Sequence, residues 1–424
     1  MDFSVCLHAA ERMTKKQDRY ISAIDVGTSK VCALISEPTA EGTLRVIGVG
    51  TAPSHGMRKG VVVDIEEASG AIAAAVDKAG RMAGCTIDVA SVGIAGGHIS
   101  AVNSHGVVAV ARSDHYVTQD DISRAVEAAR AVAIPNNREI LHVIPRSFLI
   151  DGQGGVRNPA GMLGFRLEVE AHIVTGSTTS IQNLARCVER AGVQVGDMVL
   201  QPLASSESAL STEEKEMGVV LADIGGGTTD IAIFMEGAIW HTVVLPVGGN
   251  HLTNDIAVGL RTSAAAAEEA KISYGHAMAS AVDPAETVEL ATFGSRDRQI
   301  VDRRRLAQII QARVEEIFGL ILSEVKRSGY EGLLPAGVVL AGGTASLHGI
   351  ADLGREYMQL PVRVGYPRGV SGLVDTISGP AYATSIGLLL WSQAQGTTSP
   401  TVQPTPVARP ILDKIGNWLR GFLP

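Results

Sequence analysis

A short turn between two apolar strands occurs twice in this chain and constrains its fold more than any other feature. The first copy is YISAIDVGTSKVCALIS (20–36), and the second, GVVLADIGGGTTDIAIFM (218–235), follows about two hundred residues later. Val, Ile and Ala dominate the strands and glycine lies at the turns, which is typical of β-hairpins. Helical patterns follow at 66–83, and then at 253–274 and 303–328. Two similar halves of strands and helices predict an α/β fold of two lobes with a cleft between them.

The turn of the second hairpin, DIGGGTTD, has the composition of a phosphate-binding loop. Consecutive glycines let several backbone N–H groups point to one place, and neighbouring threonines add hydroxyl donors. The residues concerned are Gly225, Gly226, Gly227, Thr228 and Thr229. Asp223 ends the preceding strand and would face the phosphates, so it needs a cation there. Hydrated Mg²⁺ fits, because it keeps several waters and uses few carboxylates.

The first hairpin supplies a matching turn, AIDVGTSK, with Asp25 in the place of Asp223. Its candidate ligand-binding residues are Gly27, Thr28, Ser29 and Lys30. One such turn from each lobe would hold the triphosphate of ATP between them, with Asp25 and Asp223 reaching Mg²⁺ through water. Neither turn is a Walker A loop, which requires GxxxxGK[ST] before a helix. The alternative is that glycines mark tight turns and nothing more, but two equivalent copies favour a ligand site.

Three other segments could complete this site. In VVLAGGTASL (338–347), a strand leads into Gly342, Gly343 and Thr344, which would let a nucleoside approach the backbone closely. In AEEAKISYG (267–275), Glu268 and Lys271 share one helix face and could reach ribose and base; an exposed ion pair is the alternative.

The segment VLQPLASSESAL (199–210) places Gln201 just before a helix that would cross between the lobes. A neutral amide at this point could orient a water molecule on the terminal phosphate. An ordinary first residue of a helix is the alternative interpretation.

Residues 91–174 interrupt the first half. They contain strand-like pieces, a helical piece (QDDISRAVEAARAV) and a glycine-rich loop at 151–164. The strand-like pieces are SVGIAGGHIS, HGVVAVAR and REILHVIPRSFLI. This pattern predicts a small inserted α+β subdomain.

The end of the chain differs from the rest. Residues 392–410 are rich in Pro, Thr, Ser and Gln, which is typical of a flexible linker, whose core we place at 396–409. Residues 410–424 follow, and on a helix their apolar side chains form one stripe. The stripe consists of Ile411, Leu412, Ile415, Trp418, Leu419, Phe422 and Leu423, with Asp413, Lys414, Asn417 and Arg420 opposite.

Such a helix is too short to span a bilayer but can lie in the membrane interface, with Trp418 at the level of the headgroups. Arg409, Lys414 and Arg420 favour anionic lipid. The alternative is a last helix that packs on the protein's own core. About eighteen linker residues give a reach of roughly 25 Å, far more than such packing requires, so we favour the membrane.

Composition excludes several other classes of protein. A hydrophobic content of 46% with 19% charged residues indicates a globular chain. The net charge of −8 and the 4% aromatic content argue against nucleic-acid binding. The four cysteines lie far apart, which favours a reducing compartment, and the histidines show no metal-ligand spacing. Residues 1–18 are expected to be a disordered extension, and either Met1 or Met13 could be the start.

The segments DVGTSK, QPLASSESAL, DIGGGTTD, AGGTASL and PAYATSIGLL follow one another like the phosphate, connecting and adenosine motifs of the actin/Hsp70/sugar-kinase ATPases. Within that superfamily the chain resembles the FtsA family of bacterial cell-division proteins over about residues 19–424. The stretches GVGTAPSHGMRKGVVVDIE and LHVIPRSFLIDGQGGVRNPAGMLG and the terminal helix carry this resemblance.

The resemblance implies an actin-like fold with the inserted subdomain and a C-terminal amphipathic helix on a linker. It implies the following parts: 19–90, 175–215 and 379–395 as the first lobe; 91–174 as the insertion; 216–248 and 328–378 as the core of the second lobe; and 249–327 as its small subdomain. The small subdomain would bind the C-terminal peptide of the tubulin-like protein FtsZ, and 91–174 would bind later division proteins. The chain would assemble into filaments and attach FtsZ to the cytoplasmic face of the inner membrane at the division site.

A basic face within 296–313 bears on the FtsZ partner, because it would attract an acidic peptide. It consists of Arg303, Arg304, Arg305 and Arg313. A solvated helix face is the alternative. Gln201 matches the catalytic glutamine of actin, but FtsA relatives do not always keep a polar residue there, so the resemblance implies slow ATP hydrolysis at most. A sugar-kinase-type phosphotransferase and a pilus-biogenesis ATPase are the remaining alternatives.

Overall fold

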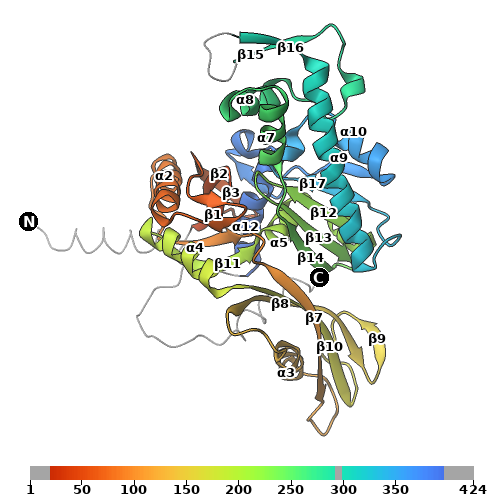
Figure 1. Cartoon of the computed structure of the whole chain (residues 1–424). Helices are drawn as coiled ribbons and strands as arrows, with labels where there is room; N and C mark the ends of the chain where they lie inside the picture. Colours follow the sequence, from red (N-terminus) through yellow and green to blue (C-terminus); the bar gives the residue numbers. More distant parts are fainter. Residues whose placement is uncertain (1–19, 292–297, 396–424) are drawn as a thin grey trace, which may run out of the picture.

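Two β-sheets of the same construction form the centres of two lobes (Figure 1). The structure is a computed structural model that describes residues 20–291 and 298–395. The first sheet contains, in spatial order, β11 (Gln194–Leu200), β6 (Val89–Ile94), β1 (Ile21–Val26), β2 (Lys30–Pro38), β3 (Leu44–Pro53) and β19 (Val370–Gly372). The second contains β14 (Ala238–Leu245), β13 (Thr229–Met235), β12 (Val219–Ile224), β17 (Val338–Ala341) and β18 (Val362–Val364). The predicted α/β fold of two similar lobes is therefore confirmed.

The two predicted hairpins are equivalent in register. β1 pairs antiparallel with β2 and β12 with β13, and each turn is closed by one backbone bond. Gly27 N donates to Lys30 O at 3.0 Å, and Gly225 N donates to Thr228 O at 2.9 Å. β1 and β12 also pair parallel with β6 and β17 respectively. Asp25 and Asp223 therefore occupy the same place in the two lobes, just before the turn.

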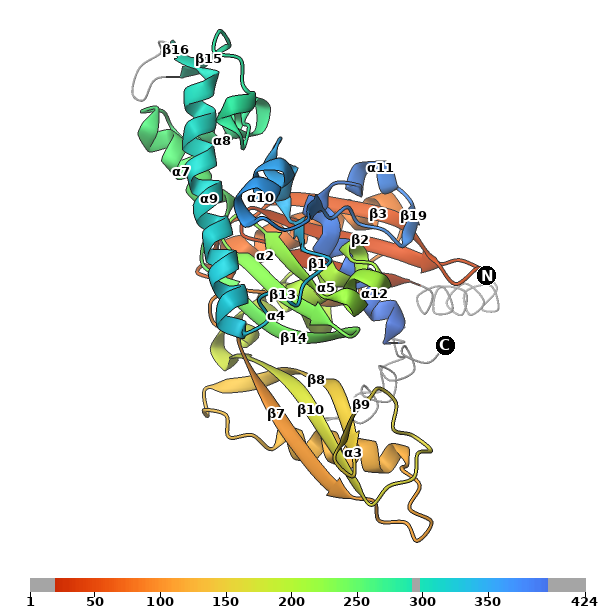
Figure 2. The ribbon, with the colours of Figure 1, turned by 90° about the vertical axis from the view of Figure 1, so that its right-hand side faces the viewer.

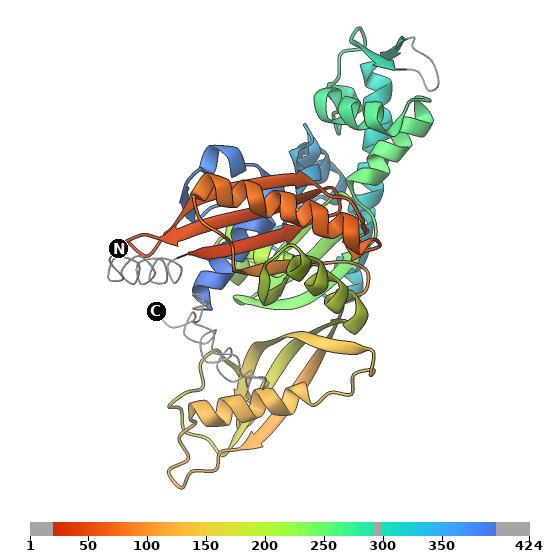
Figure 3. The ribbon, with the colours of Figure 1, turned by 90° about the vertical axis from the view of Figure 1, so that its left-hand side faces the viewer.

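Helices separate and cover the two sheets. α2 (Ile65–Ala83) and α4 (Thr178–Arg190) cover the outer face of the first sheet (Figure 3). α5 (Gln201–Ala209) and α12 (Ala383–Ala394) lie between the lobes, where one core cluster joins residues of both sheets, including Leu34 and Leu221. A Cβ on Gly387 would lie 1.8 Å from Ala204 O, so α5 and α12 cross in backbone contact. The smaller elements are β4 (Met57–Arg58), β5 (Val61–Val62), α6 (Thr212–Met217), η2 (Gly343–Ser346), α10 (Ile350–Met358), α11 (Val374–Ile377) and η3 (Pro380–Tyr382).

The small subdomain of the second lobe lies at the opposite end of the molecule from the inserted subdomain (Figure 2). Its elements are α7 (Gly249–Gly259), α8 (Ala264–Tyr274), η1 (Ala279–Ala281), β15 (Thr287–Ala291), β16 (Arg298–Asp302) and α9 (Arg303–Ser328). The helix predicted at 303–328 is confirmed. The single helix predicted at 253–274 is wrong: Arg261 adopts a φ of 51°, and the Ser263 side chain accepts from Ala266 N at 3.2 Å, which starts a second helix.

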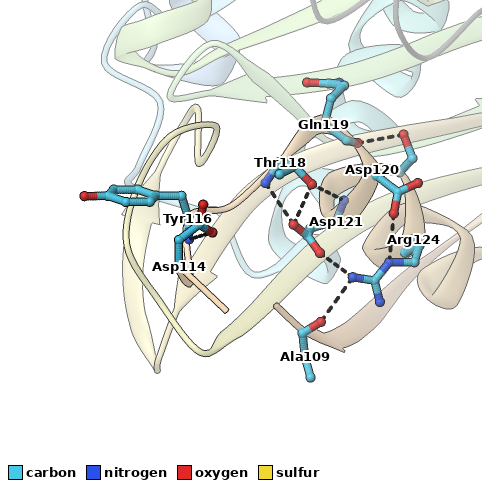
Figure 4. A network of polar contacts seen from close by, with 9 residues as sticks. Ala109, Asp114, Tyr116, Thr118, Gln119, Asp120, Asp121 and Arg124 are labelled. Atoms are coloured by element: carbon cyan, nitrogen blue, oxygen red, sulfur yellow. Dashed lines mark hydrogen bonds and ion pairs between the residues drawn. The ribbon is translucent and has the colours of Figure 1, made fainter. Parts of the chain in front are cut away.

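The inserted subdomain is a four-stranded sheet with one helix across it. The strands, in spatial order, are β7 (Ser100–Ala109), β10 (Arg166–Ser177), β8 (Arg138–Ile150) and β9 (Gln153–Val156), and the helix is α3 (Gln119–Arg130). Figure 4 shows the start of α3, where Thr118 and Asp121 cap one another and Arg124 reaches both Asp121 and Ala109 O.

Two boundaries differ from those expected. The expected start of the insertion at residue 91 falls inside β6, which pairs parallel with β1 and so belongs to the first sheet. The expected core of the second lobe, 328–378, contains β19, which instead pairs with β3 of the first sheet. In both cases the partner strand is distant in sequence, and local patterning does not identify it.

The inserted subdomain also contacts the second lobe. The His172 ring lies within 2.7 Å of Asn103 Oδ1 and 2.9 Å of Thr242 Oγ1, and Thr242 belongs to β14. Burial lowers the pKa of His172 to about 3, so this ring is neutral. Arg157 donates to both carboxylate oxygens of Glu216, at 2.8 and 2.6 Å. A segment inserted in the first half of the chain is thus attached to both lobes.

Candidate functional site

The two turns meet between the lobes. A Cβ on Gly226 would lie 2.1 Å from Ser29 Oγ, and one on Gly227 would lie 2.7 Å from Thr28 Oγ1 and 3.1 Å from the backbone of Lys59. The glycines are therefore required by close approach of the opposite turn. The structure brings together the residues of both turns that the sequence singled out.

Asp25 is held by one side chain from each crossing helix. Gln201, the first residue of α5, donates from Nε2 to Asp25 Oδ1 at 3.2 Å. Ser385, near the start of α12, donates to Asp25 Oδ2 at 2.9 Å. Burial raises the pKa of Asp25 to about 6, although the charge of Lys30 opposes this.

Asp223 has the same arrangement in the second lobe. Ser205 of α5 donates to its Oδ2 at 2.6 Å, and Thr384 of α12 donates to the same oxygen at 3.0 Å. The two hydroxyls lie 2.9 Å apart. Burial also raises the pKa of Asp223. Each aspartate is therefore bonded to both helices that lie between the lobes.

Asp230 is a third buried carboxyl group in this region, and the sequence reasoning missed it. It lies directly opposite Asp223 in the β12–β13 register. Thr228 Oγ1 donates to its Oδ2 at 2.9 Å, while Oδ1 is buried without a hydrogen-bond partner. Burial, reinforced by the charge of Asp223, raises the pKa of Asp230 to about 8. The available signal was its position as the cross-strand partner of Asp223.

Replacing Asp230 with Asn is expected to stabilise the protein, and more so at high pH. The folded-state pKa lies above the ordinary value of 3.8, so the folded protein holds a proton here that the unfolded chain releases. Stability from this group is full at low pH and is lost as the pH rises towards 8, at up to about 1.4 kcal/mol per pH unit. The variant mimics the protonated group and escapes that loss.

Thermal melting of the wild type and Asp230→Asn at pH 5, 6.5 and 8 checks this prediction. The melting temperature of the variant should exceed that of the wild type by a margin that grows with pH. An unchanging margin would show that Asp230 ionises freely in the folded protein.

The residues predicted to contact the nucleoside lie beside the turn of the second hairpin. Thr344 Oγ1 donates to Gly225 O at 3.2 Å, and Gly249 N donates to the same carbonyl at 2.8 Å. Lys271 forms an ion pair with Glu268 at 2.7 Å and donates to Gly249 O at 3.2 Å. The pair is therefore both a helix ion pair and a neighbour of the glycine turn.

Lys30 of the first turn points to the segment before α12. Its Nζ donates to Ala381 O at 2.9 Å and lies 3.5 Å from the centre of the Tyr382 ring. Gly342 N donates to Pro380 O at 3.1 Å in the same segment. Two of the predicted ligand motifs, the first turn and the Gly342 loop, thus converge on η3.

The residues of this site suit a phosphate chain with a divalent cation. Two glycine-containing turns lie against each other, and the carboxyl groups of Asp25, Asp223 and Asp230 are buried beside them. Within residues 20–291 and 298–395, no three His, Cys, Asp or Glu side chains are arranged to ligate a metal directly. Asp25 and Asp223 are the residues that could reach a cation through water, which is how Mg²⁺ commonly binds in proteins.

Comparison with known proteins decides the family. The family model for cell division protein FtsA matches residues 220–387, and that for the SHS2 domain inserted in FtsA matches residues 96–175. Cell division protein FtsA of Pseudomonas aeruginosa is 46% identical over 411 residues, which cover 95% of this chain and 98% of that protein. The chain belongs to the FtsA family. FtsA of Escherichia coli is 36% identical, with 96% of this chain and 98% of that protein covered.

Solved structures show that this FtsA-family chain has the actin-like fold. PilM, in the PilM–PilN type IV pilus biogenesis complex, has a TM-score of 0.65 at 16% identity, covering 88% of this chain and 98% of that one. MreB5 of Spiroplasma citri bound to ADP has a TM-score of 0.53 at 14% identity, covering 88% and 96%. Identities this low establish the fold alone, so the FtsA family assignment rests on the sequence relatives.

The four arginines predicted as a partner site lie on α9, and their environments differ. Arg303 forms an ion pair with Glu286, and Arg313 forms ion pairs with Asp255 and Glu316. Arg304 Nε donates to Val282 O at 3.3 Å. Arg305 is exposed. Two of the four charges are thus already neutralised within the small subdomain.

The predicted membrane helix and linker lie outside the described residues. Among the helices within the described ranges, none combines the length and apolar character needed to cross a bilayer.

Proposed function

We propose that this FtsA-family protein binds Mg²⁺–ATP between its two turns and uses it as a switch for self-assembly. The observation that carries the proposal is the meeting of two equivalent turns, one from each lobe, each with a buried aspartate tied to both crossing helices. MreB5, which shares the fold, has been solved with ADP and with AMPPNP. When bound, Mg²⁺ would offset phosphate charge; the chain itself binds, orients and encloses the nucleotide.

We propose that ATP hydrolysis is slow at most, and the position of Gln201 supports this. Its amide lies at the start of α5 and donates to Asp25, so it can orient a water near the first turn. That same bond restrains the amide, which favours binding over rapid turnover. Equilibrium binding of ATP by the full chain, with and without Mg²⁺, tests the proposal. Tight, Mg²⁺-dependent binding supports the proposal if ATP is hydrolysed more slowly than subunits exchange with filaments. An absence of binding refutes it.

The cellular role of the FtsA family is cell division, and we propose that this chain tethers FtsZ filaments to the cytoplasmic face of the inner membrane. The small subdomain would take the FtsZ C-terminal peptide, and the inserted subdomain would take later division proteins. The C-terminal helix predicted at 410–424 would bind the anionic membrane surface. A single tail binds reversibly, since interfacial burial is partial, but tails aligned along a filament act together through effective concentration.

Arg305→Glu is expected to weaken binding of the acidic FtsZ peptide roughly three- to tenfold at low salt. An exposed charge at the edge of an interface attracts a partner of opposite charge, and this substitution reverses that charge. This substitution is a cleaner test than Arg313→Glu, which would also place a carboxylate against Asp255. Fluorescence anisotropy of a labelled FtsZ peptide measures the effect.

Lys326→Glu is the matched control, because Lys326 is exposed on the same helix about 30 Å away. It makes the same change of charge and should leave the affinity unchanged. Equal losses in both variants would indicate a general effect of net charge and remove Arg305 from the partner site.

A further inference from the structure

The segment 380–385, PAYATS, is bonded to the first turn, the Gly342 loop and both aspartates of the candidate nucleotide site. Its first residues receive hydrogen bonds from the first turn and from the Gly342 loop, through Ala381 O and Pro380 O. Its last residues, Thr384 and Ser385, donate to the two aspartates. No other segment of the described chain is bonded to both aspartates through consecutive residues.

Thr384 and Ser385 lie in the first turn of α12 and form hydrogen bonds with opposite lobes. Consecutive residues on a helix point about 100° apart. Thr384 therefore reaches Asp223 of the second lobe at 3.0 Å, while Ser385 reaches Asp25 of the first at 2.9 Å. Ser385 is fully buried and Thr384 nearly so. Losing the Asp25 acceptor would cost the buried Ser385 hydroxyl its bond, whereas Thr384 would still lie 2.9 Å from the Ser205 hydroxyl. The start of α12 is therefore held most strictly to Asp25.

The body of α12 packs closely on its neighbours. Gly387 packs against Ala204 O in α5, with no room for a side chain between the helices. Seven residues beyond Thr384, or about 10 Å along the helix, Trp391 packs edge-on against His142, with ring centres 5.6 Å apart. Its Nε1 donates to Asp197 Oδ2 at 3.4 Å. A shift at the start of α12 would therefore change the surroundings of Trp391.

We propose that Thr384 and Ser385 are positioning residues that transmit the placement of Asp25 and Asp223 in the nucleotide site to α12. The inference rests on the proposed function, since a hydrated cation with phosphate must draw on the two carboxylates. When the carboxylates turn towards that cation, their hydroxyl donors turn with them, and α12 shifts against the first sheet. The shift would extend along α12 as far as Trp391.

The reporter is Trp391 in the full-length chain with Trp240→Phe and Trp418→Phe, which leaves it as the single tryptophan. Unlabelled ATP with Mg²⁺ is added, and the Trp391 emission is recorded; ATP affinity is measured separately by displacement of a fluorescent ATP analogue. Thr384→Val keeps the shape of the side chain and removes its hydroxyl, and Ser385→Ala removes the other. Thr384→Ser restores a hydroxyl at position 384.

Ser206→Ala is the matched control. Ser206 is a buried hydroxyl on α5, and it donates to Leu203 O of its own helix at 2.7 Å without reaching either aspartate. Its loss should affect stability as the other two do, but not the connection to the nucleotide site.

In the parent, which is the full-length chain with Trp391 as its single tryptophan, Mg²⁺–ATP should change the Trp391 emission. Thr384→Val and Ser385→Ala should still bind ATP within about tenfold of the parent, as expected for one lost hydrogen bond, while the emission change falls severalfold. Thr384→Ser and Ser206→Ala should retain it. A full emission change in both hydroxyl-deleted variants, or none in a parent that binds ATP, overturns the inference. A parent that does not bind ATP overturns the proposed function itself.

Discussion

Gly227→Val is expected to abolish ATP binding, with an affinity loss of at least about a hundredfold, or ~2.7 kcal/mol. A Cβ at this position would lie 2.7 and 2.9 Å from the two branches of Thr28 and 3.1 Å from the backbone of Lys59. The Thr28 side chain is branched and cannot rotate clear on both sides, and the backbone cannot yield cheaply. Valine therefore forces the two turns apart where they would hold the phosphates together. Displacement of a fluorescent ATP analogue measures the loss.

Gly70→Ala is the control for this prediction. Gly70 lies within α2, and a Cβ there would meet nothing within 4 Å. Alanine favours a helix over glycine by about 1 kcal/mol, so this variant should bind ATP as the wild type does and melt no earlier. If Gly227→Val still binds ATP tightly, the nucleotide does not lie between the turns.

Trp418→Asp is expected to lower binding to anionic vesicles by roughly ten- to a hundredfold. The substitution removes the largest side chain of the apolar stripe and places a charge in the lipid interface. Asn417→Asp changes the net charge by the same amount on the adjacent polar face, and it should lower vesicle binding no more than about threefold, through repulsion from the anionic lipid. Co-sedimentation with vesicles, with and without ATP, measures both variants.

Equal losses in the two variants would show that the effect is electrostatic and that the stripe does not enter the membrane. Under the proposed assembly mechanism, the loss in Trp418→Asp should be larger with ATP, because each filament multiplies the deficit of a single tail. A loss independent of ATP would contradict that part of the mechanism.

Sequence patterns predicted the features of the fold that depend on neighbouring residues. Both hairpins and the helix at 303–328 follow from local alternation, spacing and capping. The break after Leu260 was missed because the alanine-rich run from Ala264 has strong helix propensity, which hides the cap at Ser263. The pairing of β19 with β3 joins residues more than three hundred positions apart, and no local signal reports it.

The candidate site shows the same division. Both turns and their aspartates were identified from composition, because the chemistry of glycine and carboxylate is carried by the residues themselves. Of the donors to those aspartates, Gln201 was named, but for orienting water. Ser385 and Thr384 were not singled out, since Ser385 lies 360 residues from Asp25 and Thr384 lies 161 from Asp223. The pairing of Arg313 with Asp255 likewise depends on how α7 and α9 pack together.

Recruitment of FtsZ to membranes is the most direct test of the account. FtsZ filaments are mixed with anionic vesicles and ATP, together with the full-length chain or a 1–409 truncation that ends before the apolar stripe. The account predicts that FtsZ sediments with the vesicles only when the full-length chain is present. Equal recruitment of FtsZ by the truncation would contradict it.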